Sequence, residues 1–408
     1  MKRKIPTSYP EVTDADKEIL HKVVDDGWYT EAKYCRKFAK ELCRVSGKKH
    51  AILVNSGSSA DFIALRVMLD HFPGRYVITC ATSFPTTVAP IYQHCKVPIF
   101  IDIDPKMLSP NIGQLAYAID KYGDDVAGVI LTHMLGIPFD EALVREIIGE
   151  DRFFISDNCD AIGATTRGKP VGSWADMGTY SFFPAHHVFS GEGGAITTDD
   201  DVFAKDVVRY TNWGRDCHCM PGQSNVCGKR FEQKWGDLPH GFDHKYTFTR
   251  LGYNMKMTEF QGALGYSQIK RLDDIIDKRV KNYAYLFDKL EVFRPEYMDF
   301  VIVPTAENSF ISPFGFPIIL SEKYSWTLTY LIRYLEENGI ATRRMFGGNI
   351  IRQPAFRDLP YITMPDLDGA DIMLWRTFWI GCHTLITRDD IDYIYNTINK
   401  FYIERGLF

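Results

Sequence analysis

The chain has 408 residues, of which 45% are hydrophobic and 24% charged, a composition typical of globular proteins and unlike disordered or fibrous ones. Its formal net charge is −5 and no lysine- or arginine-rich run offsets it, so binding to nucleic acid or to an anionic membrane surface is disfavoured. The basic start lacks the apolar stretch of a signal peptide, and the most apolar run, residues 126–139, is interrupted by His133, Gly136 and Pro138. We therefore expect a cytoplasmic protein with no membrane contact and a small-molecule partner.

Short apolar segments alternate with helix-length segments through the first part of the chain. We predict strands at residues 50–55, 76–80, 97–103, 126–132, 153–156, 179–183 and 195–198. Strands separated by helices indicate an α/β fold, with a largely parallel sheet covered on both faces.

From about residue 280 the pattern changes to an α+β mixture. We predict helices at residues 279–290, 324–338 and 388–402 and a strand at 315–320. This change indicates a large domain over residues 1–275 and a smaller C-terminal α+β domain over residues 276–408. The boundary is expected inside a long helix that begins near Thr258.

The turn after the first strand has the chemistry of a phosphate site. Asn55 is followed by Ser-Gly-Ser-Ser and then by a helix, so that free backbone amides and the hydroxyl of Ser58 can face an anion beside Gly57. An isolated SGSS is more often only a helix cap with a flexible turn.

Two further residues suggest a site for an aromatic cofactor ring. Asp157 follows a strand, at the sheet edge where ligands gather in α/β proteins, and a carboxylate there can keep a pyridinium nitrogen protonated. Phe84 also follows a strand and can lie flat against such a ring. Each alone is more often a helix cap or a core aromatic; with the phosphate turn they favour a pyridoxal-type cofactor.

Five segments occur in an order and at separations that are specific to one family. They are SGSSA (56–60), SFPTT (83–87), SDNCDAIGA (156–164), SFFPAHH with GEGGAITT (181–198), and LGYNMKMTEFQGALGYSQIKRLD (251–273). The chain resembles, from about residue 5 to its C-terminus, the sugar aminotransferases, pyridoxal-phosphate enzymes of fold type I with an aspartate aminotransferase-like mixed sheet. The resemblance implies that Ser181 contacts the cofactor phosphate and that Asn254 reaches the phosphate of a neighbouring subunit in a homodimer. For Asn254 alone, a helix cap or turn is the alternative.

A histidine stands where these aminotransferases carry the lysine that bonds covalently to the cofactor. Aligned on Ser181 and on the following Gly-Glu-Gly-Gly, that place is His186. A histidine cannot hold the cofactor covalently, but an imidazole with a pKa near 6.5 suits a general base at neutral pH. The same replacement is seen in 3-dehydratases of 4-keto-6-deoxy sugars, so the resemblance implies pyridoxamine phosphate bound without a covalent link and loss of the substrate's C3 hydroxyl. The alternative is that His187 is the base, or that neither residue is.

Three cysteines lie close together in a Gly-, Pro- and Asn-containing segment. Cys217, Cys219 and Cys227 have the spacing C-x-C-x7-C, and Cys159 precedes Cys217 by 58 positions. By spacing alone, structural zinc and an iron–sulfur cluster compete, with zinc the default. The full pattern matches the iron–sulfur branch of the sugar 3-dehydratases, which implies a 2Fe-2S cluster near the cofactor and a separate flavin- and iron–sulfur-containing, NAD(P)H-dependent reductase.

The segment RRMFGGNIIRQP supplies weaker candidates for substrate contacts. Its Arg344, Asn349 and Arg352, together with His133, are candidates for sugar and diphosphate contacts, because an arginine fork suits phosphate oxygens, although a surface arginine is more often only solvated. The resemblance implies a 3,6-dideoxysugar pathway enzyme acting on a nucleotide-linked, by resemblance CDP-linked, 4-keto-6-deoxyhexose. A cluster-free dehydratase that regenerates its cofactor by transamination is the main alternative, and a non-catalytic ligand sensor is a distant third. The role of Asp160, where many relatives carry glutamine, is open.

Overall fold

A central eight-stranded sheet organises the larger part of the chain. The computed structural model describes residues 4–217, 219, 221–300 and 306–407. The strands lie in the order β1 (His50–Val54), β11 (Gly194–Thr198), β10 (Met177–Ser181), β7 (Phe153–Asp157), β6 (Val126–Thr132), β2 (Tyr76–Cys80), β3 (Val97–Ile101) and β15 (Ile362–Thr363). Neighbours from β10 to β15 are parallel, whereas β11 is antiparallel to both β1 and β10. The predicted α/β fold with a largely parallel sheet is confirmed.

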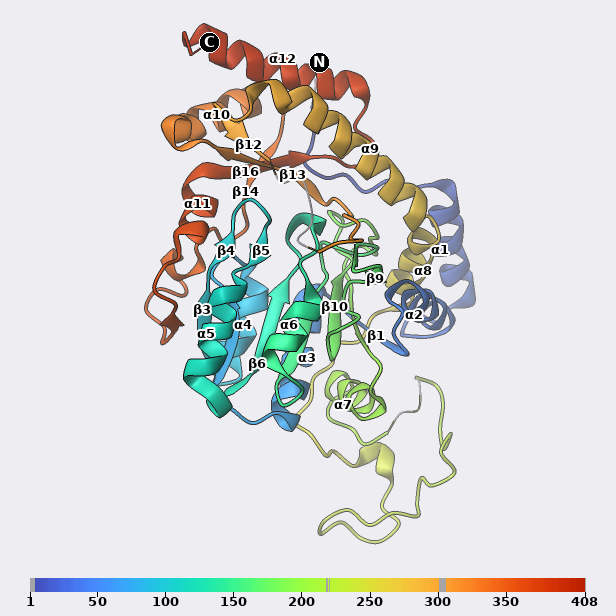
Figure 1. The fold of residues 1–408 in the computed structure, drawn as a ribbon. Coiled ribbons are helices and arrows are strands. Elements are labelled where there is room, and N and C mark those ends of the chain that lie inside the picture. Colours follow the sequence, from blue (N-terminus) through green and yellow to red (C-terminus); the bar gives the residue numbers. More distant parts are fainter. Residues whose placement is uncertain (1–3, 218, 220, 301–305, 408) are drawn as a thin grey trace.

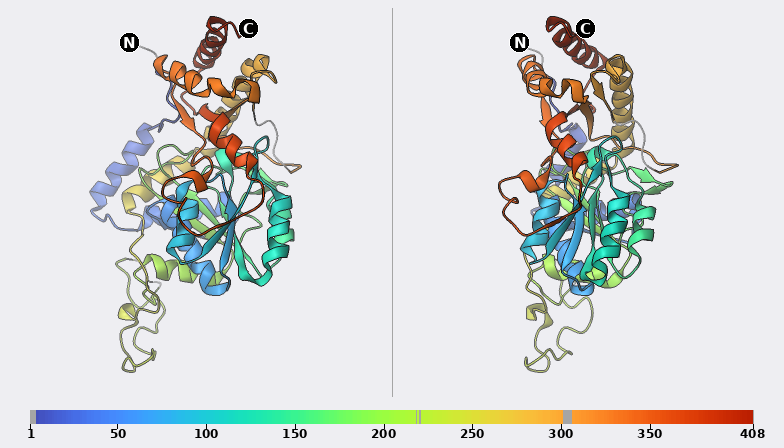
Figure 2. Two further views of the ribbon diagram at one scale, coloured as in Figure 1. Left: turned by 90° about the vertical axis from the view of Figure 1, so that its left-hand side faces the viewer. Right: turned by 60° about the vertical axis from the view of Figure 1, so that its left-hand side comes forward.

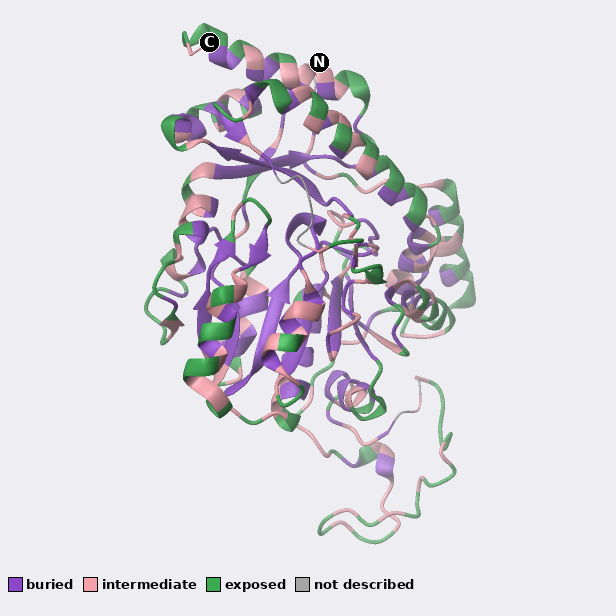
Figure 3. Cartoon of the chain, viewed as in Figure 1, coloured by how far each residue is buried: buried purple, intermediate pink, exposed green. Residues whose placement is uncertain are grey.

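Helices cover both faces of this sheet because its strands are apolar on both sides (Figures 1 and 2). On one face α3 (Gly57–His71) and α7 (Asp201–Thr211) pack through Ile63, Val67 and Val207. On the other, α5 (Ile112–Tyr122) and α6 (Glu141–Ile148) pack through a second buried cluster. Figure 3 shows the strands buried between these helical layers, with α4 (Pro85–Gln93) beside α3.

The C-terminal part builds a second sheet with its own core. Its strands are β12 (Met298–Asp299), β13 (Gly315–Leu320), β16 (Thr377–Gly381) and β14 (Thr342–Arg344), in that order. The helices that share its apolar core are α9 (Leu272–Leu290), α10 (Leu328–Glu337) and α12 (Arg388–Glu404). The domain boundary at 275 falls in α9 and stays a prediction; β15, from the C-terminal part, joins the large sheet.

The long helix expected from Thr258 is two helices, which corrects the prediction. Thr258 caps α8 (Glu259–Ile269), and the chain turns at Lys270 and Arg271 before α9 begins. Arg271 donates to the backbone carbonyl of Glu11 and to the carboxylate of Asp16, so a contact with the N-terminal segment holds the break. That segment contains α1 (Asp14–Asp26), which packs against α8, as does α2 (Lys33–Ser46).

Residues 213–253 form an arm. It projects from the end of the large sheet that lies farthest from the second sheet (Figures 1 and 2). Its described residues are mostly exposed or half-buried (Figure 3), and a 3-10 turn at His244–Tyr246 is its one regular helical element among them. Arg215 and Phe248 pair across its two limbs. Within the described ranges, every helix is too short or too polar to cross a lipid bilayer.

Candidate active site

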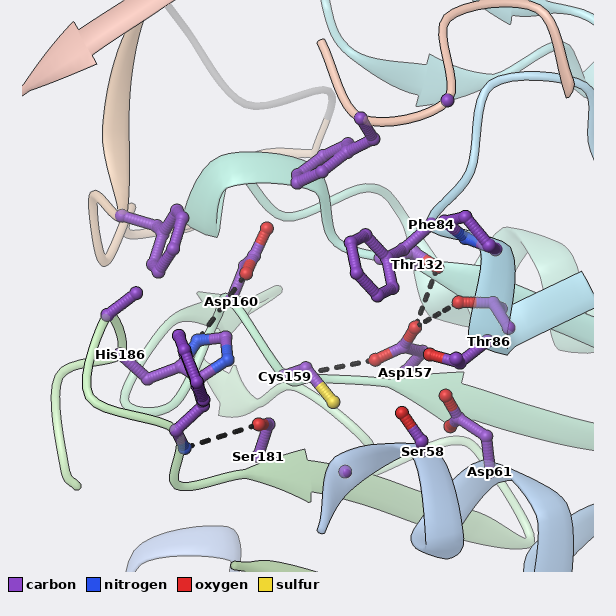
Figure 4. Close-up of a pocket in the computed structure, with 18 of the residues that line it drawn as sticks. Ser58, Asp61, Phe84, Thr86, Thr132, Asp157, Cys159, Asp160, Ser181 and His186 are labelled. Atoms are coloured by element: carbon purple, nitrogen blue, oxygen red, sulfur yellow. Dashed lines mark hydrogen bonds and ion pairs between the residues drawn. The ribbon is translucent and has the colours of Figure 1, made fainter. Parts of the chain in front are cut away.

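A cavity of about 1020 Å³ lies where the carboxyl ends of the central strands meet the second sheet. This is the edge at which ligands bind in open α/β sheets. Side chains from the ends of β7 and β10 and from the first turn of α3 converge there, as Figure 4 shows. The cavity is lined by eight of the residues predicted from the sequence: Gly57, Ser58, Phe84, Asp157, Cys159, Ser181, His186 and Arg344.

The first turn of α3 forms a cradle that fits a phosphate group. Ser56 caps the helix by accepting a hydrogen bond from the amide of Ser59 at 3.1 Å, which leaves Gly57 and Ser58 facing the cavity. A Cβ atom at Gly57 would lie 2.6 Å from the Cβ of Ser181, so only glycine allows β10 to approach this closely. Backbone amides, a positive helix end and two serine hydroxyls therefore surround one anion-sized space.

Asp157 is fixed as an acceptor at the base of the cavity. Its side chain is buried, its Oδ2 accepts hydrogen bonds from the hydroxyls of Thr87 and Thr132, both at 2.9 Å, and its Oδ1 accepts from the amide of Cys159 at 3.1 Å. Phe84 lies half-exposed at the rim. A buried carboxylate beneath a rim aromatic fits the ring of a pyridoxal-type cofactor.

His186 faces the cavity beside Asp160, with Nδ1 3.5 Å from Oδ1 of that carboxyl (Figure 4). Burial, with the nearby Arg279 guanidinium, lowers the pKa of His186 from the ordinary value of 6.5 to about 3. Burial and the neighbouring Asp157 raise the pKa of Asp160 to about 8. At pH 7 the imidazole is neutral, the form that a proton acceptor requires, and the carboxyl is protonated.

His187, the alternative base, lies away from the cavity. Its side chain is buried and its Nε2 lies 3.2 Å from the hydroxyl of Ser312. It is not among the residues that line the cavity, so the geometry favours His186.

Of the weaker substrate candidates, His133 is corrected by its surroundings, whereas Asn349 and Arg352 stay predictions. His133 is wholly buried, with Nε2 2.9 Å from Glu141 and Nδ1 accepting from the amide of Phe139, so it has no group left for a sugar. Asn349 is buried and donates to Asp371 at 2.8 Å. Arg352 pairs with the same carboxylate outside the cavity lining, because α11 (Asp368–Arg376) brings that carboxylate beside both residues.

Asn254 does not line the cavity of its own chain. It pairs with Asn212 at the root of the arm, and its Oδ1 accepts a hydrogen bond from Lys256 at 2.7 Å. The predicted contact with a neighbouring subunit stays a prediction.

The four cysteines are not brought together within one chain. Cys159 lines the active-site cavity just beyond the end of β1, near Gly57, whereas Cys217 and Cys227 line a smaller cavity of about 330 Å³ at the beginning of β1, near His50. The rise along an extended chain separates these two ends by roughly 15–20 Å.

Several lining residues are not among those predicted from the sequence. Asp61, one turn into α3, is buried and accepts from the hydroxyl of Thr179 at 2.6 Å; burial and Asp157 raise its pKa well above the ordinary value. Arg343 lines the cavity beside Arg344. Only the helical spacing of Asp61 from Gly57, one turn apart on one face, could have indicated it.

Comparisons with known proteins agree with this architecture. The Escherichia coli GDP-4-keto-6-deoxy-D-mannose-3-dehydratase, solved with bound hydrated PLP, is similar over 98% of this chain and 100% of that chain, with a TM-score of 0.85 and 27% identity. The likeness supports the predicted fold type I and a PLP-type cofactor.

Two curated relatives are closer in sequence. The lipopolysaccharide biosynthesis protein RfbH of Salmonella typhimurium is 36% identical over 98% of this chain and 92% of its own length. The dTDP-4-dehydro-2,6-dideoxy-D-glucose 3-dehydratase of Saccharopolyspora spinosa is 39% identical over 90% of this chain and 79% of its own length. The profile of the DegT/DnrJ/EryC1/StrS aminotransferase family matches residues 10–399. The chain therefore belongs to the DegT/DnrJ/EryC1/StrS aminotransferase family.

Proposed function

We propose that the protein is a pyridoxamine-phosphate-dependent C3 dehydratase of a nucleotide-linked 4-keto-6-deoxyhexose, acting in the cytoplasm. The observation that carries the proposal is the neutral imidazole of His186 in the cavity, at the place where the resembling aminotransferases have a lysine. Several relatives are themselves named as 3-dehydratases of such sugars.

The residues present fit this cofactor. The cradle at Gly57, Ser58 and Ser181 would hold its phosphate, Asp157 would bond to its ring nitrogen, and Phe84 would lie against the ring. When bound, the cofactor supplies an amine for the substrate ketone and a ring that accepts electrons. Since His186 cannot bond to it covalently, noncovalent contacts alone would keep it in place.

His186 is the proposed proton carrier. Its Nδ1 lies 3.5 Å from Oδ1 of Asp160 and makes no hydrogen bond to the described residues; in the tautomer with hydrogen on Nδ1, Nε2 can accept a proton in the cavity. The same atom can return that proton to the leaving C3 hydroxyl. Arg343 and Arg344, at the cavity wall contributed by β14, are the proposed partners of the substrate diphosphate.

Three finer features belong to the same proposal. We propose CDP as the nucleotide, a homodimer as the active unit, and a 2Fe-2S cluster that receives electrons from a separate NAD(P)H-dependent flavin and iron–sulfur reductase. The cysteine spacing supports the cluster and, through the resemblance, CDP, whereas the names of two relatives specify dTDP and GDP.

The test compares wild-type protein with His186→Ala, and with His187→Asn as the matched neighbour. Water release from CDP-, dTDP- and GDP-linked 4-keto-6-deoxyhexoses is measured together with binding of pyridoxamine phosphate. We expect His186→Ala to lose at least about a hundredfold in rate while still binding the cofactor, and His187→Asn to keep its rate. A near-wild-type rate for His186→Ala would show that the base is assigned wrongly.

Iron and sulfide analysis separates the proposal from the cluster-free alternative. Two iron and two sulfide per chain after anaerobic purification support reduction by a partner reductase. Zinc, or no metal, would favour a cluster-free dehydratase whose cofactor is regenerated by transamination. The geometry keeps that alternative open, because one chain does not gather its four predicted cysteine ligands.

A further inference from the structure

A buried arginine lies behind the wall of the active-site cavity. Arg279, on α9, is only 3% exposed, and its Nη1 donates to the backbone carbonyls of Pro313 at 3.2 Å and of Phe314 at 3.1 Å. It also contacts the thiol of Cys382, and its Nε makes no hydrogen bond to the described residues. Among these residues, the hydrogen-bond partners of the guanidinium are therefore all neutral groups.

Packing alone does not explain a cation at this position. A buried charge that has only neutral partners destabilises a fold, and an apolar side chain of similar volume often packs in its place with less loss of stability. Both carbonyls that Arg279 binds belong to a segment that reaches the cavity, where Phe314 forms part of the lining. The guanidinium therefore holds a part of the active-site wall.

His186 packs against this part of the wall. The ring centroid of Phe314 lies 5.1 Å from that of His186, and the ring of Trp379 supports Phe314 at 5.4 Å. Nδ1 of His186 makes no hydrogen bond to the described residues. The contact with the Phe314 ring therefore contributes strongly to the orientation of the imidazole, and a displaced ring would let the imidazole turn.

The segment that carries Phe314 is held from two sides. On the side of the large sheet, its amides donate to a tight turn: the amide of Ser312 to the carbonyl of Gly136 and that of Phe314 to the carbonyl of Leu135, both at 2.9 Å. On the other side, Arg279 binds the carbonyls. Without Arg279 these buried carbonyls would lose their charged donor, and the segment would be held by its amides alone.

We propose that Arg279 is a positioning residue for His186: by binding the carbonyls of Pro313 and Phe314, it holds the aromatic wall that keeps the imidazole turned toward the cavity. The inference rests on the proposed function for the role of His186 as proton carrier, but not for the contact between the wall and the imidazole.

The charge of Arg279 supports the same role. After burial, this charge is the second cause that lowers the pKa of His186. Asp160 and His187 are the other titratable groups that face the imidazole among the described residues. A neutral donor could hold the wall, but it would not disfavour a positive charge on His186. An arginine does both.

The first measurement observes His186 directly. Full-length protein with ring-labelled histidine is studied by NMR with and without pyridoxamine phosphate, and His186→Asn assigns the resonance. Arg279→Met should shift the ring resonances of His186 because the Phe314 ring moves, whereas Arg279→Lys should shift them less because an ammonium group can still donate to a carbonyl. Lys281→Met, at an exposed cation of the same helix, should match wild type.

The second measurement is a double-mutant cycle on the dehydration rate, with whichever of the CDP-, dTDP- and GDP-linked sugars wild type converts. Arg279→Met should lower kcat about tenfold or more while KM and the affinity for pyridoxamine phosphate change less than about twofold. Phe314→Leu should also lower kcat. If Arg279 acts through Phe314, adding Arg279→Met to Phe314→Leu should lower kcat less than about twofold further.

Arg279→Lys replaces Arg279→Met in the cycle if the methionine variant does not fold, which circular dichroism and cofactor binding establish. Unchanged resonances of His186 in a folded Arg279 variant, an unchanged kcat, or effects of the two substitutions that simply multiply would each overturn the proposal. If wild type dehydrates none of the three sugars, the proposed function is wrong, and the resonances of His186 still decide whether Arg279 positions the imidazole.

Discussion

The surroundings of His186 and Asp160 determine the protonation states of these two side chains at neutral pH. Asp160 is buried near Asp157 and Cys159; it accepts a hydrogen bond from the amide of Leu135, and His186 is the one imidazole paired with it among the described residues. Desolvation therefore keeps it protonated, and the neutral carboxyl does not force a charge onto the imidazole. An ionised carboxylate here would instead raise the pKa of His186 and make it a donor.

Asp160→Asn should change how stability depends on pH. In the folded protein the pKa of Asp160 is about 8, against 3.8 in an unfolded chain, so the folded state holds this proton to higher pH and the free energy of unfolding falls as pH rises from about 4 to 8. The lowered pKa of His186, about 3, makes the free energy of unfolding increase with pH, but only below pH 6.5. Between pH 6.5 and 8 the free energy of unfolding of the variant should therefore decrease less steeply than that of wild type. The difference in slope should be up to about 1.4 kcal/mol per pH unit.

Urea unfolding of the cofactor-free protein at several pH values measures this slope. Asp124→Asn, at an exposed carboxylate, is the matched control and should follow wild type. An equally steep decline in Asp160→Asn would mean that Asp160 is already ionised at neutral pH.

The connection from β1 into α3 shows how one element builds the phosphate cradle. β1 is antiparallel to β11, which pairs with β10, so the end of β10 at Ser181 meets the start of α3. The close approach requires that Gly57 have no side chain, because an added Cβ would also lie 3.2 Å from the sulfur of Cys159.

Gly57→Ala should weaken cofactor binding more than it weakens the fold. Moving α3 away from Ser181 opens the cradle, so we expect about tenfold or more loss of affinity for pyridoxamine phosphate and about 1–3 kcal/mol lower stability. Gly113→Ala, near the start of α5, meets only Asn111 at 3.5 Å and should be neutral or stabilising. Fluorescence titration measures the affinity, and thermal unfolding measures the stability. An unchanged affinity in Gly57→Ala would show that the cradle does not bind the cofactor phosphate.

The sequence predicts best the strands that are formed by a continuous run of buried apolar residues. The apolar runs at β2, β6 and β13 have the predicted bounds, because β6 and β13 are buried along their whole length and β2 at every residue but Tyr76. The strand predicted to 103 ends at Ile101 because Asp102 turns to accept from the amides of Gly369 and Ala370, both at 2.7 Å, more than 260 residues away in the chain. The residues that neighbour Asp102 in the sequence give no indication of such a distant contact.

Site residues, too, could be predicted where the local chain fixes their positions, but not where a distant contact does. Gly57, Ser58 and Asp157 could be predicted because strand ends and a helix start fix their places in any parallel sheet. His133 also follows a strand, yet its side chain turns inward to Glu141, which sequence spacing does not reveal.

At the scale of the whole molecule, the arm is the surface most suited to a second copy of the chain. Large apolar side chains are exposed along it, with Leu251 93% exposed and Tyr246 and Phe248 more than half exposed. Monomeric proteins seldom leave such side chains grouped together in water. Asn254, Cys217, Cys219 and Cys227 lie on or next to this arm, so we expect a homodimer to bring them toward the partner's active site.

Mixing two inactive variants tests whether Asn254 acts across the dimer. Chains with His186→Ala keep Asn254, and chains with Asn254→Ala keep His186. If Asn254 serves the partner's phosphate, a mixed dimer has one site with both residues intact and one site with neither. After joint unfolding and refolding in equal amounts, about a quarter of wild-type activity should return, because random pairing makes half of the dimers mixed and each has one intact site of two. If Asn254 serves its own chain, every site in the mixture lacks one residue, and the activity stays at the level of the separate variants.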